Sequence, residues 1–437
     1  MSNNGSLENL FKLQENNTDV KTEVIAGFTT FMTMAYIIFV NPTILSDAGM
    51  PFDGVFIATI MGAVLGTMAM ALLSNYPFAL ASGMGLNAFF AYSVVIGMGV
   101  SWQAALGIIF LEGVIFIILS VTPVREMIVN SIPMALKTGI STGIGLFIAF
   151  IGLQNAEIVV NNDATLVGMG NLLEGSALVA LFGLIFTGIL HAKKVKGALL
   201  WGILASTVFG WFNGVTPAFN GVVAMPKMSD WSGVLFQLDI GAALNVGMIG
   251  VILSFLFVDM FDTAGTLVGV SQQAGYIDEN GDLPKASRAL LADAIGTTGG
   301  ALFGTSTVTT YVESASGVAE GGRTGLTGVV VSILFFLSLF FKPLIAIVPG
   351  AATAPALIIV GTMMMTNITA LDWDDFTEIL PAFIAMIAMP LTYSISNGIA
   401  LGFIVYPLVK LFTGKGKDVH WLVYVLGVVF VFYFVFH

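Results

Sequence analysis

Long apolar runs dominate the chain from about residue 25 onward. Two examples are Gly325–Phe341 and Gly398–Phe412, which with their flanks reach roughly the 20 residues that a helix needs to cross a bilayer. The whole chain, interpreted in this way, predicts about 14 spans, the first beginning near Ile25. A further apolar tail, Trp421–Phe436, is either another crossing or a helix along the bundle. We therefore expect an all-α polytopic membrane protein and not an outer-membrane barrel, whose alternating pattern is missing.

Two stretches interrupt the spans with glycine and small polar residues. They are SGMGLNAFFAYSVV (Ser82–Val95) and GTSTVTTYVESASG (Gly304–Gly317), and Glu313 follows Asn87 by 226 positions, close to half the chain. Interruptions at corresponding places in two halves are typical of transporters with a site near the membrane midplane. We expect two discontinuous helices, each led by a short β-like segment, whose free N–H groups face one polar pocket. The alternative is two kinked helices with glycine-rich packing faces.

Composition narrows the class further. The chain is 57% hydrophobic and 9% charged, against about 25% charged residues in soluble domains. Residues 1–23 lack the apolar core of a signal peptide, so no cleavable signal is expected. Because there is no cysteine, thiolate catalysis and cysteine-ligated metals are excluded. A net charge of −11 argues against nucleic acid as a partner, and we expect no metal and no cofactor.

The basic residues predict the orientation in the membrane. With the N-terminus in the cytoplasm, only Lys227 and Lys342 fall on the outer side. The bases assigned to the cytoplasmic side are Lys12, Lys21, Arg125, Lys137, Lys193, Lys194, Lys196, Lys285, Arg288, Arg323, Lys410, Lys415 and Lys417. This bias is the positive-inside rule, and it predicts a multi-pass protein of the cell membrane.

Acids inside apolar spans are the main functional candidates, because each costs roughly 2.5–3.5 kcal/mol to insert. They are Glu112, Asp259, Asp262, Asp293 and Glu313. Asp259 and Asp262 are three residues apart on one helix, and two acids in a low dielectric rarely both ionise, so this pair can hold a proton. Glu112 is expected to be a structural partner of a helix end or a hydroxyl. Asp293 either pairs with Arg288, caps a neighbour or takes part in function.

The missing residue types predict the kind of substrate. In this interpretation no arginine or lysine lies within a span, whereas a phosphate or carboxylate substrate normally calls for such a base. The three histidines, His191, His420 and His437, fall at segment ends, so a buried proton relay would use carboxylates. The pocket suits a neutral or cationic solute with N–H donors. A planar heterocycle fits, stacked on an aromatic ring such as Tyr311 or Phe90.

Four motifs together resemble the adenine/guanine/hypoxanthine permeases, a purine branch of the nucleobase–ascorbate transporters. They are GFTTFMTMAYIIFVNP (Gly27–Pro42), GMGLNAFF (Gly83–Phe90), FVDMFDTAGT (Phe257–Thr266) and GTSTVTTYVESASGVAEGGRTG (Gly304–Gly325). The resemblance runs from about Ile25 to Phe412. It implies a fold similar to the uracil permease, with two inverted repeats of seven spans, proton coupling and often a homodimer.

The resemblance also implies a division into a core domain that holds the base and a gate domain that completes the cleft. The core would comprise residues 24–123 (spans 1–4) and 240–341 (spans 8–11). The gate would comprise residues 124–215 (spans 5–7) and 342–413 (spans 12–14). Residues 1–23 and 414–437 would be terminal segments, the latter with a further apolar helix.

Site residues follow from the same motifs, position by position. The resemblance assigns substrate binding to Asp259, Glu313, Asn87, Gly85, Tyr311 and Thr310. Thr263 stands where the uracil permease has a histidine, so the role of that histidine in proton coupling cannot be copied. We expect proton coupling to use Glu313, Asp259, Asp262 and Asp293. The predicted function is proton-coupled uptake of adenine, guanine or hypoxanthine, by alternating access between core and gate.

Other functions compete with this prediction. Within transporters, the alternative is a xanthine or uracil carrier. A cation channel is a remote alternative, because carboxylate rings in channels come from symmetric subunits. An intramembrane aspartyl protease is another, but it would need aspartates on separate helices and a GxGD pattern. GMGLNA (Gly83–Ala88) fits a dinucleotide pattern without the surrounding βαβ unit, so we expect no enzyme.

Overall fold

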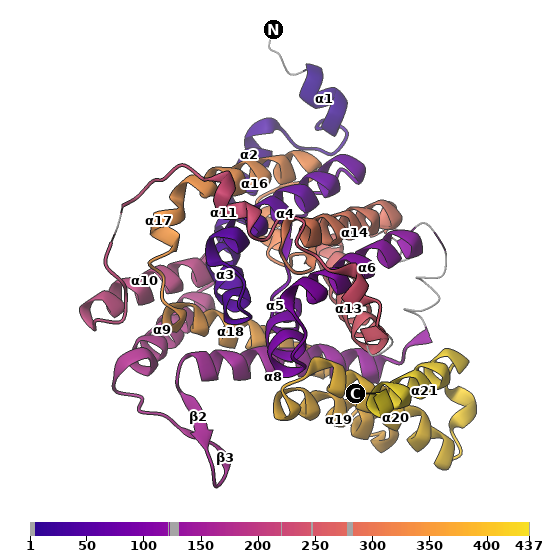
Figure 1. Ribbon diagram of the computed structural model, residues 1–437. Coiled ribbons are helices and arrows are strands. Elements are labelled where there is room, and N and C mark those ends of the chain that lie inside the picture. The colour runs from indigo at the N-terminus through magenta and orange to yellow at the C-terminus, as the bar shows by residue number, and fades with distance from the viewer. Residues whose placement is uncertain are drawn as a thin grey trace.

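The computed structural model describes residues 5–120, 122, 131–219, 221–245, 248–277 and 283–436, and these are mostly helical (Figure 1). Arg125, one of the bases assigned to the cytoplasmic side, lies outside them. By length and composition, nine helices in the described ranges could cross a membrane, and four shorter apolar helices accompany them. A mostly helical polytopic membrane protein is thereby confirmed.

The described part of the first half contains three short strands among its helices. β2 and β3 pair with each other, whereas β1 pairs with β4 of the second half. α5 and the π-helix that follows form one continuous segment, Met84–Gly97. The elements are α1 (Gly5–Phe11), α2 (Val20–Met34), α3 (Ile37–Asp47), α4 (Phe52–Leu73), β1 (Leu80–Ser82), α5 (Met84–Ala88), the π-helix (Phe89–Gly97), α6 (Trp102–Ser120), α8 (Met134–Asn155), β2 (Val159–Asn162), β3 (Leu166–Met169), α9 (Gly175–Ala192) and α10 (Ala198–Phe212).

The second half repeats the theme of long helices around one short strand. The elements are α11 (Met228–Ser232), α12 (Ile240–Ala243), α13 (Ile249–Ala274), α14 (Ala286–Phe303), β4 (Val308–Thr310), α15 (Ser314–Ala319), α16 (Gly325–Ser338), α17 (Lys342–Ile345), α18 (Gly350–Met364), α19 (Phe376–Thr392), α20 (Ile395–Phe412) and α21 (Trp421–Phe436). The apolar tail is therefore a helix, α21, and it packs on α20 and α13.

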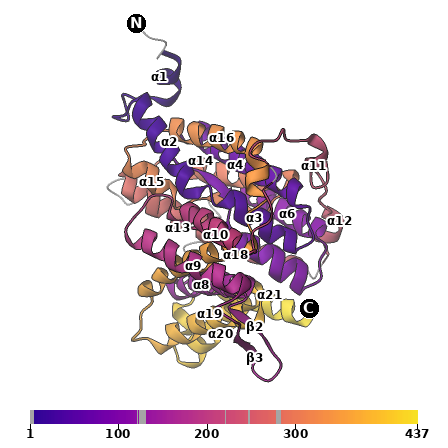
Figure 2. The same cartoon turned by 90° about the vertical axis from the view of Figure 1, so that its left-hand side faces the viewer.

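The helices fall into two groups in space. α2, α4, α14 and α16 pack on one another at the top of Figure 1, and α8, α19, α20 and α21 form the bottom (Figures 1 and 2). α13 contacts α6 on one side and α8 and α20 on the other, so it lies where the two groups meet. This arrangement places chemistry carried by α13 at the boundary between them.

The two interrupted stretches meet as a two-stranded antiparallel sheet. β1 pairs with β4 so that Leu80 lies opposite Thr310 and Ser82 opposite Val308. The Gly83 N–H donates to the Thr307 carbonyl at 3.0 Å, which extends the ladder. Each strand leads into a helical segment, at Met84 and at Ser314, so the two predicted β-like leads are confirmed. Extended backbone at this depth is possible because each strand satisfies the polar groups of the other.

Close helix contacts around this sheet depend on small residues. α6 crosses α14 at Gly113, where a Cβ atom would lie 2.8 Å from the backbone nitrogen of Thr298. The backbone of Thr298 cannot move aside to make room for this atom, whereas the end of a flexible side chain could. The contact fixes α6 against α14 and thereby positions Glu112, the residue before this glycine.

We expect Gly113→Ala to lower stability by about 1–3 kcal/mol through overpacking, although alanine is the better helix former. Thermal unfolding of the purified protein in detergent measures the change. Gly188→Ala on α9 is the matched control, because a Cβ atom there meets no atom within 4 Å. Equal melting temperatures for Gly113→Ala and wild type would contradict the proposed close contact.

Candidate functional site

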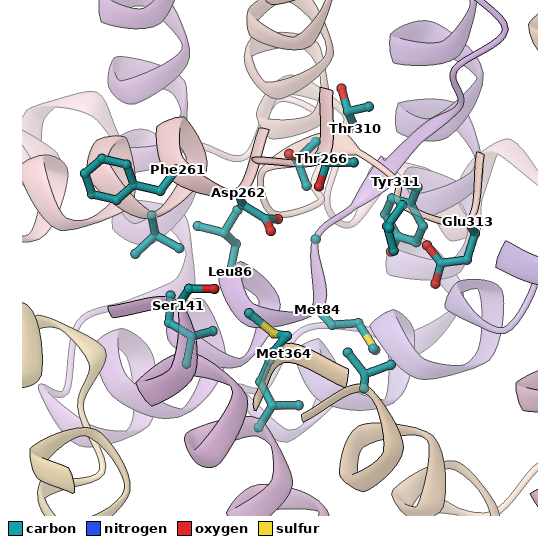
Figure 3. Close-up of a pocket in the computed structure, with 18 of the residues that line it drawn as sticks. Met84, Leu86, Ser141, Phe261, Asp262, Thr266, Thr310, Tyr311, Glu313 and Met364 are labelled. Atoms are coloured by element: carbon teal, nitrogen blue, oxygen red, sulfur yellow. The ribbon is translucent and has the colours of Figure 1, made fainter. Parts of the chain in front are cut away.

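A cavity of about 770 Å³ lies where the two helix groups meet, and the sheet forms part of its wall (Figure 3). One side comes from the α2–α3 junction, the β1–α5 turn, α13, and β4 with the residues after it. The other side comes from α8 and α18. The lining residues are Tyr36, Gly83, Met84, Gly85, Leu86, Ile140, Ser141, Ile144, Ile148, Val258, Phe261, Asp262, Thr266, Thr309, Thr310, Tyr311, Val312, Glu313, Val360 and Met364.

The charged side chains among these lining residues are two acids, Asp262 and Glu313. Figure 3 shows them on opposite sides of the cavity, Asp262 from α13 and Glu313 from the turn after β4. Met84, Ser141 and Met364 lie below them in that view. Two carboxyl groups that face one apolar space can accept hydrogen bonds from opposite edges of a flat ligand.

Glu313 is held in position by Tyr36, whose hydroxyl donates to Glu313 Oε1 at 2.7 Å. Tyr36 follows the end of α2, where the span breaks before α3 begins at Ile37. Its ring lies 6.4 Å from the ring of Tyr311, measured between centroids. Tyr311 in turn donates its hydroxyl to the Ser82 carbonyl at 2.5 Å, so this ring is tied to β1.

Glycines let the β1–α5 turn approach its neighbours. A Cβ atom on Gly83 would lie 2.7 Å from Thr309 Cγ2, and one on Gly85 would lie 2.7 Å from Ile144 Cγ2. Gly83 therefore fits tightly against β4, and Gly85 against α8 on the far side of the cavity. The predicted role of Gly85 thus has a structural counterpart, because its backbone forms part of the cavity wall.

A second group of acids lies behind the wall. Asp259 and Asp293 are fully buried, and Thr263 Oγ1 lies 3.3 Å from Asp259 Oδ1 and 3.0 Å from Asp293 Oδ2. The other oxygen of Asp293 accepts from the backbone N–H and the hydroxyl of Thr310, at 3.0 and 3.1 Å. Asp293 therefore anchors the end of β4.

Asp259 differs from its expected place. It does not line the cavity, whereas Asp262 does. A separation of three residues turns a helix by about 300°, so the two side chains diverge by about 60° and only one of them faces the opening. The expected pair on one helical face is thus divided between the cavity and the buried group.

Three other expected contacts also differ from the structure. Asn87 is buried, and its Oδ1 accepts from Ser306, which links the two interrupted segments behind the cavity. Thr310 lines the cavity, but Asp293 takes both its donors. Phe90 is fully buried outside the lining and cannot stack on a ligand there, whereas Tyr311 is at the wall.

Residues that the sequence did not reveal complete the cavity. Tyr36, Ser141 and Met364 all contribute to the wall. Tyr36 lies within the first of the family-like motifs. Its role depends on a break between α2 and α3, and no glycine at that position indicates the break in the sequence. Ser141 and Met364 face the cavity only because α8 and α18 pack against the other helix group.

Known proteins that are similar to this chain are permeases. Residues 21–401 match the Permease family (Xan_ur_permease). The guanine/hypoxanthine permease PbuO of Bacillus subtilis is 47% identical over 428 residues, which cover 96% of this chain and 98% of PbuO. The adenine permease AdeP of Escherichia coli is 45% identical over 435 residues, 100% of this chain and 97% of AdeP.

The fold is also similar to a solved structure, the transmembrane domain of a cyanobacterium bicarbonate transporter, BicA. The TM-score is 0.64 at 14% sequence identity, and the match covers 86% of this chain and 97% of that one. At this identity the similarity concerns the fold alone.

Because the chain has no cysteine, single cysteines can map the cavity. We expect Ser141→Cys, at the cavity wall on α8, to react with a small charged thiol reagent, measured by mass spectrometry of the intact protein. Ser254→Cys on α13 is the matched control and should stay unmodified. Ser254 is fully buried, and its hydroxyl donates to Gly250 in its own helix. Equal modification at both positions would contradict the assigned cavity.

Proposed function

The chain belongs to the Permease family and is a multi-pass membrane transporter, not an enzyme, and we propose that it takes up adenine, guanine or hypoxanthine together with protons. The names of the relatives support this substrate class, since identities of 45–47% extend over nearly the whole of each chain. A xanthine or uracil carrier is the alternative within the family.

The observation that carries the proposal is the pair of acids on opposite walls of the cavity, Asp262 and Glu313 (Figure 3). A purine base is flat and carries N–H groups on its edges, and a carboxylate accepts such donors. Apolar side chains of the cavity lining, such as Met84 and Phe261, would cover the faces of the rings. An anionic substrate would be repelled by this arrangement.

Each binding residue then has a defined task. Asp262 takes the contact that the resemblance gave to Asp259, and Glu313 accepts from the opposite edge of the base. Tyr36 positions Glu313 through its hydroxyl. The backbone N–H groups of the first turn after Gly83 have no partner within the helix, and they would donate to ring acceptors. The ring of Tyr311 provides a flat wall.

Alternating access would come from movement between the two helix groups. We assign α2–α6 and α13–α16 to a core and α8–α10 and α18–α20 to a gate, in a 14-span fold of two inverted repeats. The cavity lies between them, since α8 and α18 form its second wall. Elsewhere between the two groups, the Tyr92 hydroxyl accepts from the Asn155 side chain at 3.0 Å, and this contact joins core to gate. We expect the contacts between core and gate to differ between the inward-facing and the outward-facing state.

Proton coupling follows from the cost of burying charge. A cavity with two ionised acids is expensive to enclose, and a proton lowers that cost before the core moves past the gate. We keep Glu313, Asp259, Asp262 and Asp293 as candidate proton carriers. A cytoplasmic N-terminus and a homodimer stay predictions.

Uptake by proteoliposomes tests the function. We expect radiolabelled adenine, guanine or hypoxanthine to accumulate only with an inward proton gradient, while uracil stays outside. Accumulation of uracil but of no purine would favour the alternative carrier, and a failure to accumulate any base would contradict the proposal.

In the same assay, Asp262→Asn and Glu313→Gln should each lower uptake at least about ten-fold, because a hydrogen bond to a charged group is worth about 1.5–3 kcal/mol. Glu174→Gln, an exposed acid at the start of α9, is the control and should keep wild-type uptake. If both cavity variants also kept wild-type uptake, the base would have to bind elsewhere.

A further inference from the structure

Three fully buried acids outside the cavity wall lie around α6. Glu112 is on α6 itself, and Asp259 and Asp293 are on α13 and α14, which both pack on α6 (Figure 1). Glu112 Oε2 accepts from the Thr307 hydroxyl at 3.0 Å. The titratable groups that interact with Glu112 are Asp259 and Asp293. Glu112 is thus bonded to a hydroxyl, as expected, but it also meets an acid.

The contacts of Thr263 favour a proton on one of these acids. Thr263 Oγ1 lies 3.3 Å from Asp259 Oδ1, 3.0 Å from Asp293 Oδ2 and 2.7 Å from Thr309 Oγ1. A hydroxyl has one proton to donate and two lone pairs. If Thr263 donates to one acid, the other acid can bond to it only by donating. A proton on Asp259 or Asp293 would let all three contacts be separate two-centre hydrogen bonds.

Within the described part of the chain, the unpartnered oxygen of Glu112, next to Asp259, favours the same result. Two ionised carboxylates are both acceptors and cannot bond to each other. Glu112 Oε1 is buried and receives no hydrogen bond from any donor among the described residues. One proton shared with Asp259 would satisfy this oxygen and would remove one negative charge from the protein interior.

Resting on the proposed function, we propose that the Glu112–Asp259 pair stores the transported proton, which reaches it from the cavity through the hydroxyls of Thr309 and Thr263. Thr309 lines the cavity, and Thr263 touches both Thr309 and Asp259. The proton site is then separate from the residues that hold the base. The role that we assign to Glu112 is therefore proton coupling, in place of the structural role expected from the sequence.

The transfer balances as a relay along hydroxyl groups. Thr309 Oγ1 accepts a proton from a hydronium ion in the cavity and releases its own proton to Thr263 Oγ1. Thr263 passes its own proton to Asp259, which shares it with Glu112. Each hydroxyl ends with one proton, and the carboxyl pair gains one. After the cavity has opened to the other side of the membrane, the same steps in reverse release the proton to water there.

The route also explains how base and proton affect each other. Thr309 belongs to β4, and Glu313, which would hold the base, follows β4 by three residues. Asp293 ties the end of the same strand through Thr310. A base that binds Glu313 would therefore shift β4, the strand that carries the Thr309 hydroxyl.

The test compares exchange with accumulation in proteoliposomes that contain a trapped pH indicator. Glu112→Gln keeps the shape and a donor but cannot gain or lose a proton. We expect it to retain counterflow of labelled purine without a gradient, and to lose both gradient-driven accumulation and purine-dependent proton entry. Glu112→Asp, which keeps a carboxyl group, should restore part of the accumulation; a purely structural role would not separate the two readouts in this way.

Thr263→Val removes the relay hydroxyl at nearly constant volume and should give the same split between exchange and accumulation. Ser254→Ala is the control, since this buried hydroxyl on α13 donates to the Gly250 carbonyl of its own helix. If Glu112→Gln does not fold, the Thr263→Val result decides alone. Wild-type accumulation and proton entry in either variant would overturn the relay. Failure of the wild type to exchange any purine would instead contradict the proposed function.

Discussion

Everything in this structure depends on the pairing of β1 with β4. Extended backbone within a membrane protein must satisfy its N–H and C=O groups internally, and a three-residue strand cannot do so alone. Here each strand serves as the partner of the other across 228 residues of sequence, with Ala81 opposite Thr309. The Thr67 hydroxyl, which bonds both the N–H and the carbonyl of Leu80, covers part of the outer edge.

Two neighbouring threonines of β4 connect the cavity wall to the buried acids. Thr309 points toward the cavity and toward Thr263, whereas Thr310 gives its N–H and hydroxyl to Asp293. Both threonines line the cavity that we assign to the base, and the buried acids lie behind them. A separation of this kind allows a transporter to bind substrate and proton at distinct but mechanically connected positions.

The sequence could predict the parts of this design that depend on local chemistry. Glycines and small polar residues in mid-span marked both interrupted stretches, and acids within apolar spans marked Asp262 and Glu313. The sequence could not predict which side chains face the cavity. Whether Asp259 or Asp262 faces the cavity depends on the rotation of α13 by a fraction of a turn, which the packing of α6, α8 and α20 determines. Tyr36 and Glu112 depend likewise on partners that lie far away in sequence, Glu313 and Asp259.

The most direct test of the account is an experimental structure of the purified protein with bound hypoxanthine or guanine. We expect a flat ligand between Asp262 and Glu313, with Glu313 still bonded to Tyr36 and with Asp259 out of contact with the base. A ligand bound directly to Asp259, or bound outside the cavity between the two helix groups, would contradict it.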